Sequence, residues 1–364
     1  MRVGIIGGGQ LGRMLVQAGA DLGIACTTLD PNADSPAARV GPAIVGAYDD
    51  ADALASLAAE ADVVTYEFEN VPVAGVRALA ERVPVHPGPA SLEAGQDRLA
   101  EKHLFTEVGL PVPLYAAVED LASLPEAIEA VGLPAVLKSR RLGYDGKGQV
   151  VIADAALAED AWRRIGEVPA LLEALVPFDQ EVSILSVRGR DGEIRSWPLV
   201  ENEHEEGILR RSFAPARGAE PPVQAAAEAH AGAILERLDH VGVLAIELFR
   251  VGEELFGNEM APRVHNSGHW TIEGAETSQF ENHLRAICGL PLGETTVAGH
   301  AAMVNLIGGV PEAAEVLRLP GAHLHLYGKR PLPRRKVGHV TLRGDDPRSL
   351  WAKVLQVSEL AADA

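Results

Sequence analysis

The sequence predicts a protein of α/β and α+β class in three parts, which we place at residues 1–95, 96–290 and 291–364. Three observations lead to this division. The chain has 364 residues, more than a single hydrophobic core usually supports. Short apolar strands alternate with helical stretches over the first part, which indicates a doubly wound parallel α/β domain. Proline- and glycine-rich breaks at 87–89 and 289–291 then separate this domain from a mixed central domain and a small C-terminal domain rich in strands.

Composition and charge exclude several classes of protein. Hydrophobic residues make up 47% of the chain, so disorder is not expected. The formal net charge of -19 argues against non-specific binding of nucleic acid, because no general basic surface is available to phosphates. No stretch approaches the roughly 20 uninterrupted apolar residues of a membrane span, and the glycine-broken N-terminus does not resemble a signal peptide. We therefore expect a cytoplasmic protein with no membrane or nucleic-acid partner.

In the first domain, a glycine-rich turn follows the first strand. We expect strands at 3–6, 25–29, 43–45, 63–66 and 83–86 and helices at 11–22 and 51–59. The turn, GGGQLG, can direct backbone N–H groups at an anion. It is similar to the GxGxxG dinucleotide fingerprint, with Asp30 as a candidate ribose ligand. An NAD-dependent enzyme is a weak alternative, because nothing later in the chain supplies a site for hydride transfer.

The segment TYEFEN ends the strand at 63–66 with two acids. The two-residue period of a strand puts Glu67 and Glu69 on one side, and the carboxyl ends of parallel strands face the ligand crevice. We favour Glu69 as a substrate contact because it lies further toward the loop. A solvated acid pair is the alternative.

The central and C-terminal parts mix strands and helices. We expect helices at 91–108, 157–165, 223–238 and 279–287, strands at 135–138, 149–152, 170–176, 181–188, 194–200, 243–249 and 254–256, and then strands at 297–305, 322–327 and 336–342 before a final helix.

A lysine closes the strand at 135–138, and a glycine-rich loop follows it. Lys138 stands where a strand residue is ordinarily apolar, and the loop RRLGYDGKGQ carries one acid together with three bases. This pattern is typical of a flexible flap over a polyphosphate, although its spacing is not that of a P-loop. A surface hairpin with a glycine turn is the alternative.

The strand at 170–176 has an acid within an apolar run, and Glu181 follows soon after. Its backbone can pair with the edge of an adenine ring, and carboxylates can bind ribose hydroxyls. This signal is weak when taken alone.

The strands at 243–249 and 254–256 predict a hairpin that presents two acids side by side. Glu247 lies inside the first strand, and Asn258 and Glu259 lie at the end of the second. Paired carboxylates suit Mg²⁺, which binds one or two of them together with substrate phosphates. Arg263, His265 and Asn266 follow at once and would form a site for a small anion. A hairpin with solvated acids is the alternative.

A dense basic cluster lies at 326–339, within an acidic chain. It contains the segments LYGK and PRRKVGH. Local positive charge of this kind suits a phosphomonoester, and a solvated charged loop is the alternative.

Taken in order, these motifs resemble the ATP-grasp superfamily. The segments GGGQLGRM, YDGKGQ, NEMAPRVHNSGHWT, HLYGK and RRKVGH narrow the resemblance to the N5-carboxyaminoimidazole ribonucleotide synthase family of purine biosynthesis, over essentially the full length. The first part then corresponds to a pre-ATP-grasp domain, and the central part to an ATP-grasp domain with a lid at about 112–176. Formate-dependent glycinamide ribonucleotide transformylase and biotin carboxylase share this architecture. Another ATP-grasp ligase and a non-catalytic nucleotide-binding regulator are the open alternatives.

The resemblance implies roles for particular residues. ATP-binding positions are Arg98, Lys138, Gly143, Tyr144, Asp145, Gly146, Lys147, Gly148, Gln149, Glu173, Ala174, Leu175, Val176, Glu181, His204, Asn258 and Glu259. Mg²⁺ would bind Glu247 and Glu259, and bicarbonate would bind Arg263, His265 and Asn266. Positions for aminoimidazole ribonucleotide are Gly9, Gln10, Leu11, Glu69, Tyr144, Lys147, Lys329, Arg335 and Lys336.

Two of these assignments stay open. Lys147 stands where the family leads us to expect an arginine, so it keeps the charge but loses the bidentate fork. The sequence does not decide whether Arg335 or Lys336 binds the substrate phosphate.

The implied reaction is the ATP- and bicarbonate-dependent carboxylation of 5-aminoimidazole ribonucleotide through carboxyphosphate. We expect Asp145, on the flap, to handle the amine proton, with Lys329 steering charge nearby. The implied cofactors are ATP and Mg²⁺, with no use for biotin, flavin or nicotinamide, and the implied assembly is a homodimer.

Overall fold

The computed structural model describes residues 1–143 and 146–362. Its N-terminal sheet is parallel, with strand order β3-β2-β1-β4. The elements are β1 (Arg2–Ile6), α1 (Gln10–Asp21), β2 (Ala25–Asp30), β3 (Ala43–Val45), α2 (Ala51–Glu60), β4 (Val63–Tyr66) and α3 (Val73–Ala80). Val3 and Ile5 of β1 pack in one core with α1, whereas Ile6 packs in another with α2 and α3. Alternate side chains thus bury both faces of the sheet, and the predicted doubly wound domain is confirmed.

The predicted strand at 83–86 is wrong. This segment makes only an isolated parallel bridge between Val85 and Val64. Pro84 has no N–H group to donate to a longer ladder, and Pro87 closes the segment.

The predicted single helix at 91–108 is two helices, α4 (Pro89–Gln96) and α5 (Arg98–Glu107). Asp97 breaks the run because it has extended backbone angles and its carboxylate accepts hydrogen bonds from Leu99 N–H and Ala100 N–H. It is therefore the N-cap of α5, and it makes Arg98 the first residue of that helix.

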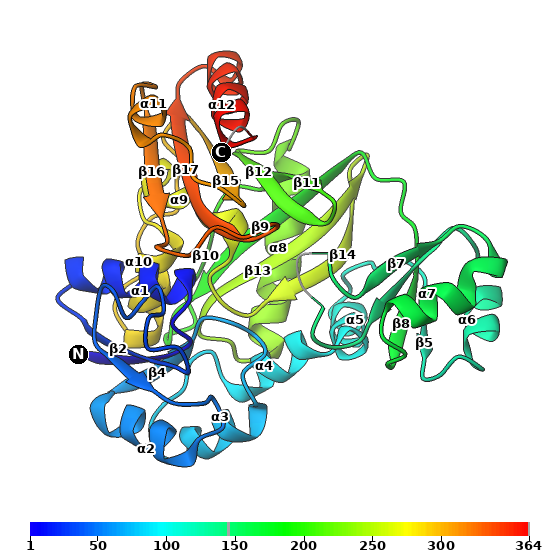
Figure 1. The fold of residues 1–364 in the computed structure, drawn as a ribbon, viewed down its shortest axis with the longest axis horizontal. Helices are drawn as coiled ribbons and strands as arrows, with labels where there is room; N and C mark the ends of the chain where they lie inside the picture. The colour runs from blue at the N-terminus through cyan, green and yellow to red at the C-terminus, as the bar shows by residue number, and fades with distance from the viewer. Residues whose placement is uncertain (144–145, 363–364) are drawn as a thin grey trace.

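A small antiparallel sheet with strand order β5-β8-β6-β7 forms the segment predicted to be a lid, which projects from the body at the right of Figure 1. Its elements are β5 (Tyr115–Val118), α6 (Leu124–Val131), β6 (Ala135–Ser139), β7 (Gln149–Ile152), the 3₁₀ turn η1 (Ala155–Leu157), α7 (Ala158–Arg164) and β8 (Ala170–Ala174). Strand β8 is shorter than the predicted 170–176, because Ala174 pairs with Ala135 at the start of β6. Leu175 and Val176 therefore lie outside the strand.

One large antiparallel sheet runs through the rest of the molecule in the order β14-β13-β9-β11-β12-β15-β17-β16, with β10 beside β9. Its strands are β9 (Gln180–Arg188), β10 (Ile194–Ser196), β11 (Val200–Glu205), β12 (Ile208–Ala214), β13 (Gly242–Val251), β14 (Glu254–Ala261), β15 (His300–Ile307), β16 (Ala322–Leu326) and β17 (Lys336–Gly344). The helices with them are α8 (Pro221–Arg237), the 3₁₀ turn η2 (Asn266–Gly268), α9 (Thr271–Gly274), α10 (Gln279–Cys288), α11 (Ala313–Leu317) and α12 (Pro347–Ala362). Because β15 pairs with β12, the C-terminal strands extend the central sheet (Figure 1).

Three predicted strands in this sheet depart from the observed strands by three or more residues at one end or are split. The segment 194–200 is split between β10 and β11: Trp197 N–H still donates to Leu185 O in the register of β10, but Pro198 has no N–H group, and β11 pairs with β9 in a register shifted by one residue. The segment 254–256 is the beginning of a strand that continues to Ala261, because it pairs with β13 along its whole length. The segment 297–305 becomes a strand only from His300, where pairing with β17 begins.

Strand β13 separates two cores by alternation. Leu244, Ile246 and Leu248 pack with α8, whereas Val243 and Ala245 pack with α10. Glu247 continues the second set, so its carboxylate lies on the face opposite α8. In the part of the chain that the structure describes, no helix has the length and apolar character needed to cross a membrane.

Candidate active site

Two carboxylates from neighbouring strands form the centre of the site. Glu247 of β13 pairs directly with Glu259 of β14, so the two acids lie side by side as predicted, although Glu259 lies inside its strand and not at its end. Burial and the charge of Glu259 raise the pKa of Glu247. Burial also acts to raise the pKa of Glu259, but the charges of Arg98 and Lys138 outweigh it and hold that pKa below its usual range. A cation placed between the two carboxylates would relieve this repulsion.

The donor set fits Mg²⁺. Both carboxylates supply hard oxygen atoms, and both keep part of their side chain exposed, 15% for Glu247 and 40% for Glu259. Among the described residues, no group of three or more His, Cys, Asp or Glu is placed to hold a metal ion. The protein would therefore contribute these two carboxylates, and substrate phosphates and water would complete the coordination.

Behind this pair, one buried carboxylate binds two lysines. Glu173 of β8 accepts hydrogen bonds from Lys102 Nζ at 3.0 Å and from Lys138 Nζ at 2.8 Å, and all three residues are buried. Lys138 also donates to Asn258 Oδ1 (3.2 Å), and Lys102 donates to the main-chain oxygens of Gly257 and Asn258. The lid and β14 are thus joined by charge and hydrogen bonds. In the segment from Ala174 to Val176, which follows Glu173, the N–H groups of Ala174 and Leu175 donate to Leu114 O and Pro134 O, so these two donors are used within the chain.

Sequence reasoning missed Lys102. It lies on α5 among polar residues, where a lysine normally faces solvent, and its carboxylate partner is 71 positions away. No local pattern in the sequence distinguishes it from an exposed lysine.

Arg98 links the acid pair to the flap. Its Nη1 donates to Glu259 Oε2 at 2.9 Å, and a Cβ on Gly143 would lie 3.4 Å from its Nη2. Gly146 and Gly148 have φ of +73° and +70°, which favours glycine at both positions. Gln149 begins β7, and Lys147 is exposed. The predicted contacts of Tyr144 and Asp145 lie outside the described residues.

Glu181 and His204 form a second polar pair on the large sheet. His204 Nδ1 lies 2.9 Å from Glu181 Oε2. Burial alone would lower the pKa of His204, but the hydrogen bond to Glu181 and the charge of Glu247 raise it to about 9. A protonated imidazole beside a carboxylate supplies both a donor and an acceptor, which suits a ribose or a phosphate.

The loop after β14 carries the three predicted anion ligands and brings His265 to the acid pair. Arg263 Nη2 donates to Glu69 Oε2 at 2.7 Å, which brings together two residues with separately predicted roles. His265 Nε2 lies 3.6 Å from Glu247 Oε1, and burial together with the charge of Arg263 lowers the pKa of His265 to about 3. Asn266 exchanges two amide hydrogen bonds with Asn305 (3.1 and 2.6 Å).

The glycine-rich turn is occupied by the chain's own acids. Gly9 N–H and Gly12 N–H donate to the Glu67 carboxylate at 2.9 and 3.2 Å, and Gly8 N–H donates to Asp30 Oδ2 at 2.8 Å. The expectation that these N–H groups bind an external anion is therefore wrong. The NAD alternative also fails, because Asp30 is used inside the domain. Sequence reasoning chose Glu69 over Glu67 and did not assign Glu67 this role.

Two predicted substrate residues meet at the boundary between the first and last parts of the chain. Lys329 Nζ donates to Gln10 Oε1. The neighbouring Leu11 is buried in the core, so its side chain is not available to a ligand.

Lys336 and Arg335 differ in their surroundings. The charge of Lys336 contributes to lowering the pKa values of Glu247 and His265, so Lys336 acts on the centre of the site. Arg335 is exposed, and its Nη1 donates to Arg330 O at 3.4 Å.

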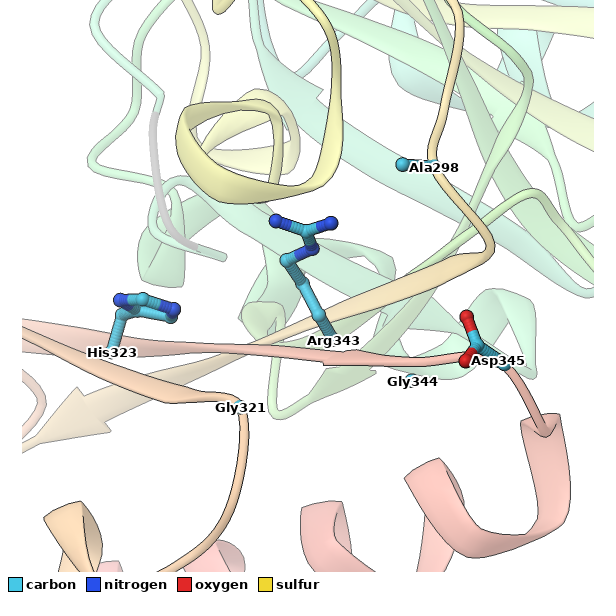
Figure 2. A pocket seen from close by; sticks show the side chains of 6 residues that line it. All are labelled: Ala298, Gly321, His323, Arg343, Gly344 and Asp345. Carbon is cyan, nitrogen blue, oxygen red and sulfur yellow. The ribbon is translucent and has the colours of Figure 1, made fainter.

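A surface hollow of about 270 Å³ lies elsewhere, over the outer C-terminal strands (Figure 2). Its lining contains none of the residues described above and consists of Ala298, Gly321, His323, Arg343, Gly344 and Asp345.

Comparison with known proteins covers the three parts of the chain. Residues 1–96 match the ribonucleotide synthetase preATP-grasp domain, residues 103–280 the ATP-grasp domain, and residues 301–353 the phosphoribosylaminoimidazole carboxylase C-terminal domain. The chain is 52% identical to N5-carboxyaminoimidazole ribonucleotide synthase of Pseudomonas aeruginosa, over 99% of each chain.

Solved structures agree with this match. The N5-carboxyaminoimidazole ribonucleotide synthetase of Thermus thermophilus superimposes with a TM-score of 0.94 at 54% identity, over 98% of each chain. The N5-carboxyaminoimidazole synthase of Aspergillus clavatus, in complex with ADP and 5-aminoimidazole ribonucleotide, gives 0.93 at 30% identity, over 100% of this chain and 99% of that one. The chain therefore belongs to the N5-carboxyaminoimidazole ribonucleotide synthase family of ATP-grasp proteins.

Proposed function

We propose that this protein uses ATP and bicarbonate to carboxylate 5-aminoimidazole ribonucleotide, releasing ADP and phosphate. The observation that carries the proposal is the pairing of Glu247 with Glu259 next to Lys138 and to the loop of Arg263, His265 and Asn266. Under this proposal, the cation site, the phosphate-binding lysine and the small-anion site are neighbours. Family membership supports the identity of the substrate, because the Aspergillus clavatus relative was solved with ADP and 5-aminoimidazole ribonucleotide.

In the first step, a bicarbonate oxygen attacks the γ-phosphorus of ATP, and the bond to the β-phosphate oxygen breaks to give carboxyphosphate and ADP. Arg263 and Asn266 hold bicarbonate, and Lys138 and Arg98 balance charge on the phosphates. Mg²⁺ bound by Glu247 and Glu259 would neutralise charge on the transferred phosphoryl group. Most of the rate enhancement then comes from positioning and electrostatics.

In the second step, the exocyclic amine of the ribonucleotide attacks the carboxyl carbon. The carbon–oxygen bond to phosphate breaks, phosphate leaves, and the amine loses one proton. We assign that proton to Asp145 and place Lys329 nearby to steer charge, and we assign the ribonucleotide to the surface between the glycine-rich turn, Glu69 and Lys336. The flap excludes water, which would otherwise hydrolyse the acyl phosphate.

The test is phosphate release from Mg-ATP with both bicarbonate and the ribonucleotide, compared with reactions that lack one of them. We expect strong dependence on both. If omission of the ribonucleotide makes no difference, the substrate assignment is wrong, and if omission of bicarbonate makes none, another acid is the substrate, as in a formate-dependent ATP-grasp ligase.

A substitution tests the acid pair directly. Glu259→Gln should abolish phosphate release while the thermal transition is kept, because the carboxylate that faces Glu247 is lost but its volume is not. Glu254→Gln, on the same strand but exposed, is the matched control and should keep normal turnover. Normal turnover by Glu259→Gln would remove the metal role from this residue.

A homodimer in the cytoplasm stays a prediction from family membership. Light scattering of the purified protein tests the first part, and cell fractionation tests the second.

A further inference from the structure

The anion-binding loop after β14 is held in place by three separate side chains. Glu69 binds Arg263, Asn305 binds Asn266, and Gln279 binds the main chain of His265. The first two anchors act on side-chain groups. Gln279 binds the backbone, and it has no role in the proposed reaction steps.

Gln279 is the first residue of α10 and is fully buried. Its Oε1 accepts a hydrogen bond from His265 N–H at 2.8 Å, and its Nε2 donates to His265 O at 2.7 Å. One residue thereby receives both bonds that an antiparallel strand would supply to it. Strand β14 ends at Ala261, so His265 has no neighbouring strand to bind. The Gln279 carboxamide supplies the two backbone hydrogen bonds that such a strand would make.

The orientation of the carboxamide is fixed by its partners. A flipped amide would place its NH₂ against the His265 N–H and its oxygen against the His265 carbonyl, which removes both bonds. The second amide hydrogen of Nε2 faces His269 Nδ1 at 3.4 Å. Gln279 N–H donates to Thr271 Oγ1, and Thr271 Oγ1 donates to Gly268 O, so the base of the loop is tied to the same point.

There is no spare room around this anchor. A Cβ on Gly268 would lie 2.2 Å from Leu185 Cδ2 and 2.6 Å from Gln279 Oε1, so the loop backbone is packed directly on the carboxamide. A shift of Gln279 therefore moves His265 and its neighbours.

We propose that Gln279 is a positioning residue for the bicarbonate-binding loop: its carboxamide holds the main chain of His265 and so fixes that imidazole beside Glu247. This inference rests on the proposed function. A displacement of about 1 Å in such a loop can lower the rate by about 100-fold, even though Gln279 touches no reacting atom.

The same helix provides a matched control. Asn282 is also fully buried, and it brackets the backbone of Gly293 in the same way, with Nδ2 donating to Gly293 O (3.1 Å) and Oδ1 accepting from Gly293 N–H (2.7 Å). Gly293 leads to the C-terminal strands and has no part in the site. Gln279→Met and Asn282→Leu both replace an amide with an apolar group of similar size, and each leaves one backbone N–H and one carbonyl without that partner.

The experiment measures melting temperature and steady-state phosphate release while bicarbonate or ATP is varied. Both variants should melt at a lower temperature than the wild type. Only Gln279→Met should raise KM for bicarbonate and lower kcat, together by about 10- to 100-fold, with KM for ATP within about twofold of wild type. Equal bicarbonate kinetics in the two variants would overturn the inference.

The isosteric Gln279→Glu is the second variant, and it tests the positioning role if Gln279→Met does not fold. It keeps an acceptor for His265 N–H but loses the amide donor to His265 O, so it should also raise KM for bicarbonate. An unchanged KM in this variant overturns the inference. Failure of the proposed function is distinguished by the wild type, whose phosphate release would then not depend on bicarbonate.

Discussion

Replacement of Glu173 by glutamine should destabilise the protein strongly, because it removes one negative charge from between two buried lysines. The Lys102 and Lys138 side chains are 1% and 8% exposed, and that of Glu173 is 2% exposed. Breaking a buried ion pair by removing one partner costs about 3–5 kcal/mol. At about 2–4 °C per kcal/mol for a domain of about 150–250 residues, the melting temperature should fall by roughly 6–20 °C.

The assay is thermal unfolding followed by circular dichroism at constant pH and salt. Glu119→Gln is the control, because Glu119 also pairs with a cation, Arg140, but its side chain is 62% exposed. An exposed pair contributes about 0–1 kcal/mol, so this variant should melt close to the wild type. If Glu173→Gln also melts within about 2 °C of the wild type, below the range expected for a buried pair, the two lysines are not held by this carboxylate.

Three further predictions concern pH, the basic cluster and the metal. Burial lowers the pKa values of His240 and His283 to about 3, so between pH 6.5 and 3 the unfolded chain binds more protons than the folded one. The free energy of unfolding therefore keeps the full contribution of these histidines above pH 6.5. It falls below that pH, by roughly 2 kcal/mol per histidine at pH 5. Equal urea midpoints of unfolding at pH 7 and pH 5 would contradict this prediction. Lys336→Met should raise KM for the ribonucleotide by about 10-fold or more, whereas Arg335→Met should change it less than about threefold, since the charge of Lys336 acts on Glu247 and Arg335 is exposed. The reverse order would assign the substrate to Arg335. Chelation of divalent ions should stop phosphate release and Mg²⁺ should restore it, and turnover that persists with excess chelator would remove the metal from the mechanism.

The sequence predicted those parts of the site that depend on local pattern. Two apolar runs separated by a short turn predict a hairpin, and the hairpin brings the strand that carries Glu247 beside the strand that carries Glu259. The bulge in register between Glu247 and Leu248 had no signal in the sequence. Counted from the turn, Leu248 pairs with Gly257, so a regular ladder would put Asn258 opposite Glu247, and the bulge is what brings Glu259 there.

The sequence did not predict those parts that depend on distant partners. Lys102 meets Glu173 across 71 positions, and Glu67 meets Gly9 across 58. Each of these charged residues has a more common role at the surface, so its burial follows only from the tertiary fold. The break at Asp97 is different, because an aspartate before a helical run is a recognisable N-cap and the signal was present.

The hydrogen bonds of the Glu67 carboxylate to the glycine-rich turn limit which ligands this domain could come to bind through mutation. Glu67 directly follows β4 of the same sheet. Its carboxylate is therefore covalently attached to the domain, and it competes with any free anion for the N–H groups of the turn. Tethered ligands of this kind act at effective concentrations of millimolar or more, far above those of a dinucleotide in dilute solution. These N–H groups cannot come to bind a dinucleotide pyrophosphate by gradual improvement of the glycines, because the acid would have to be lost first.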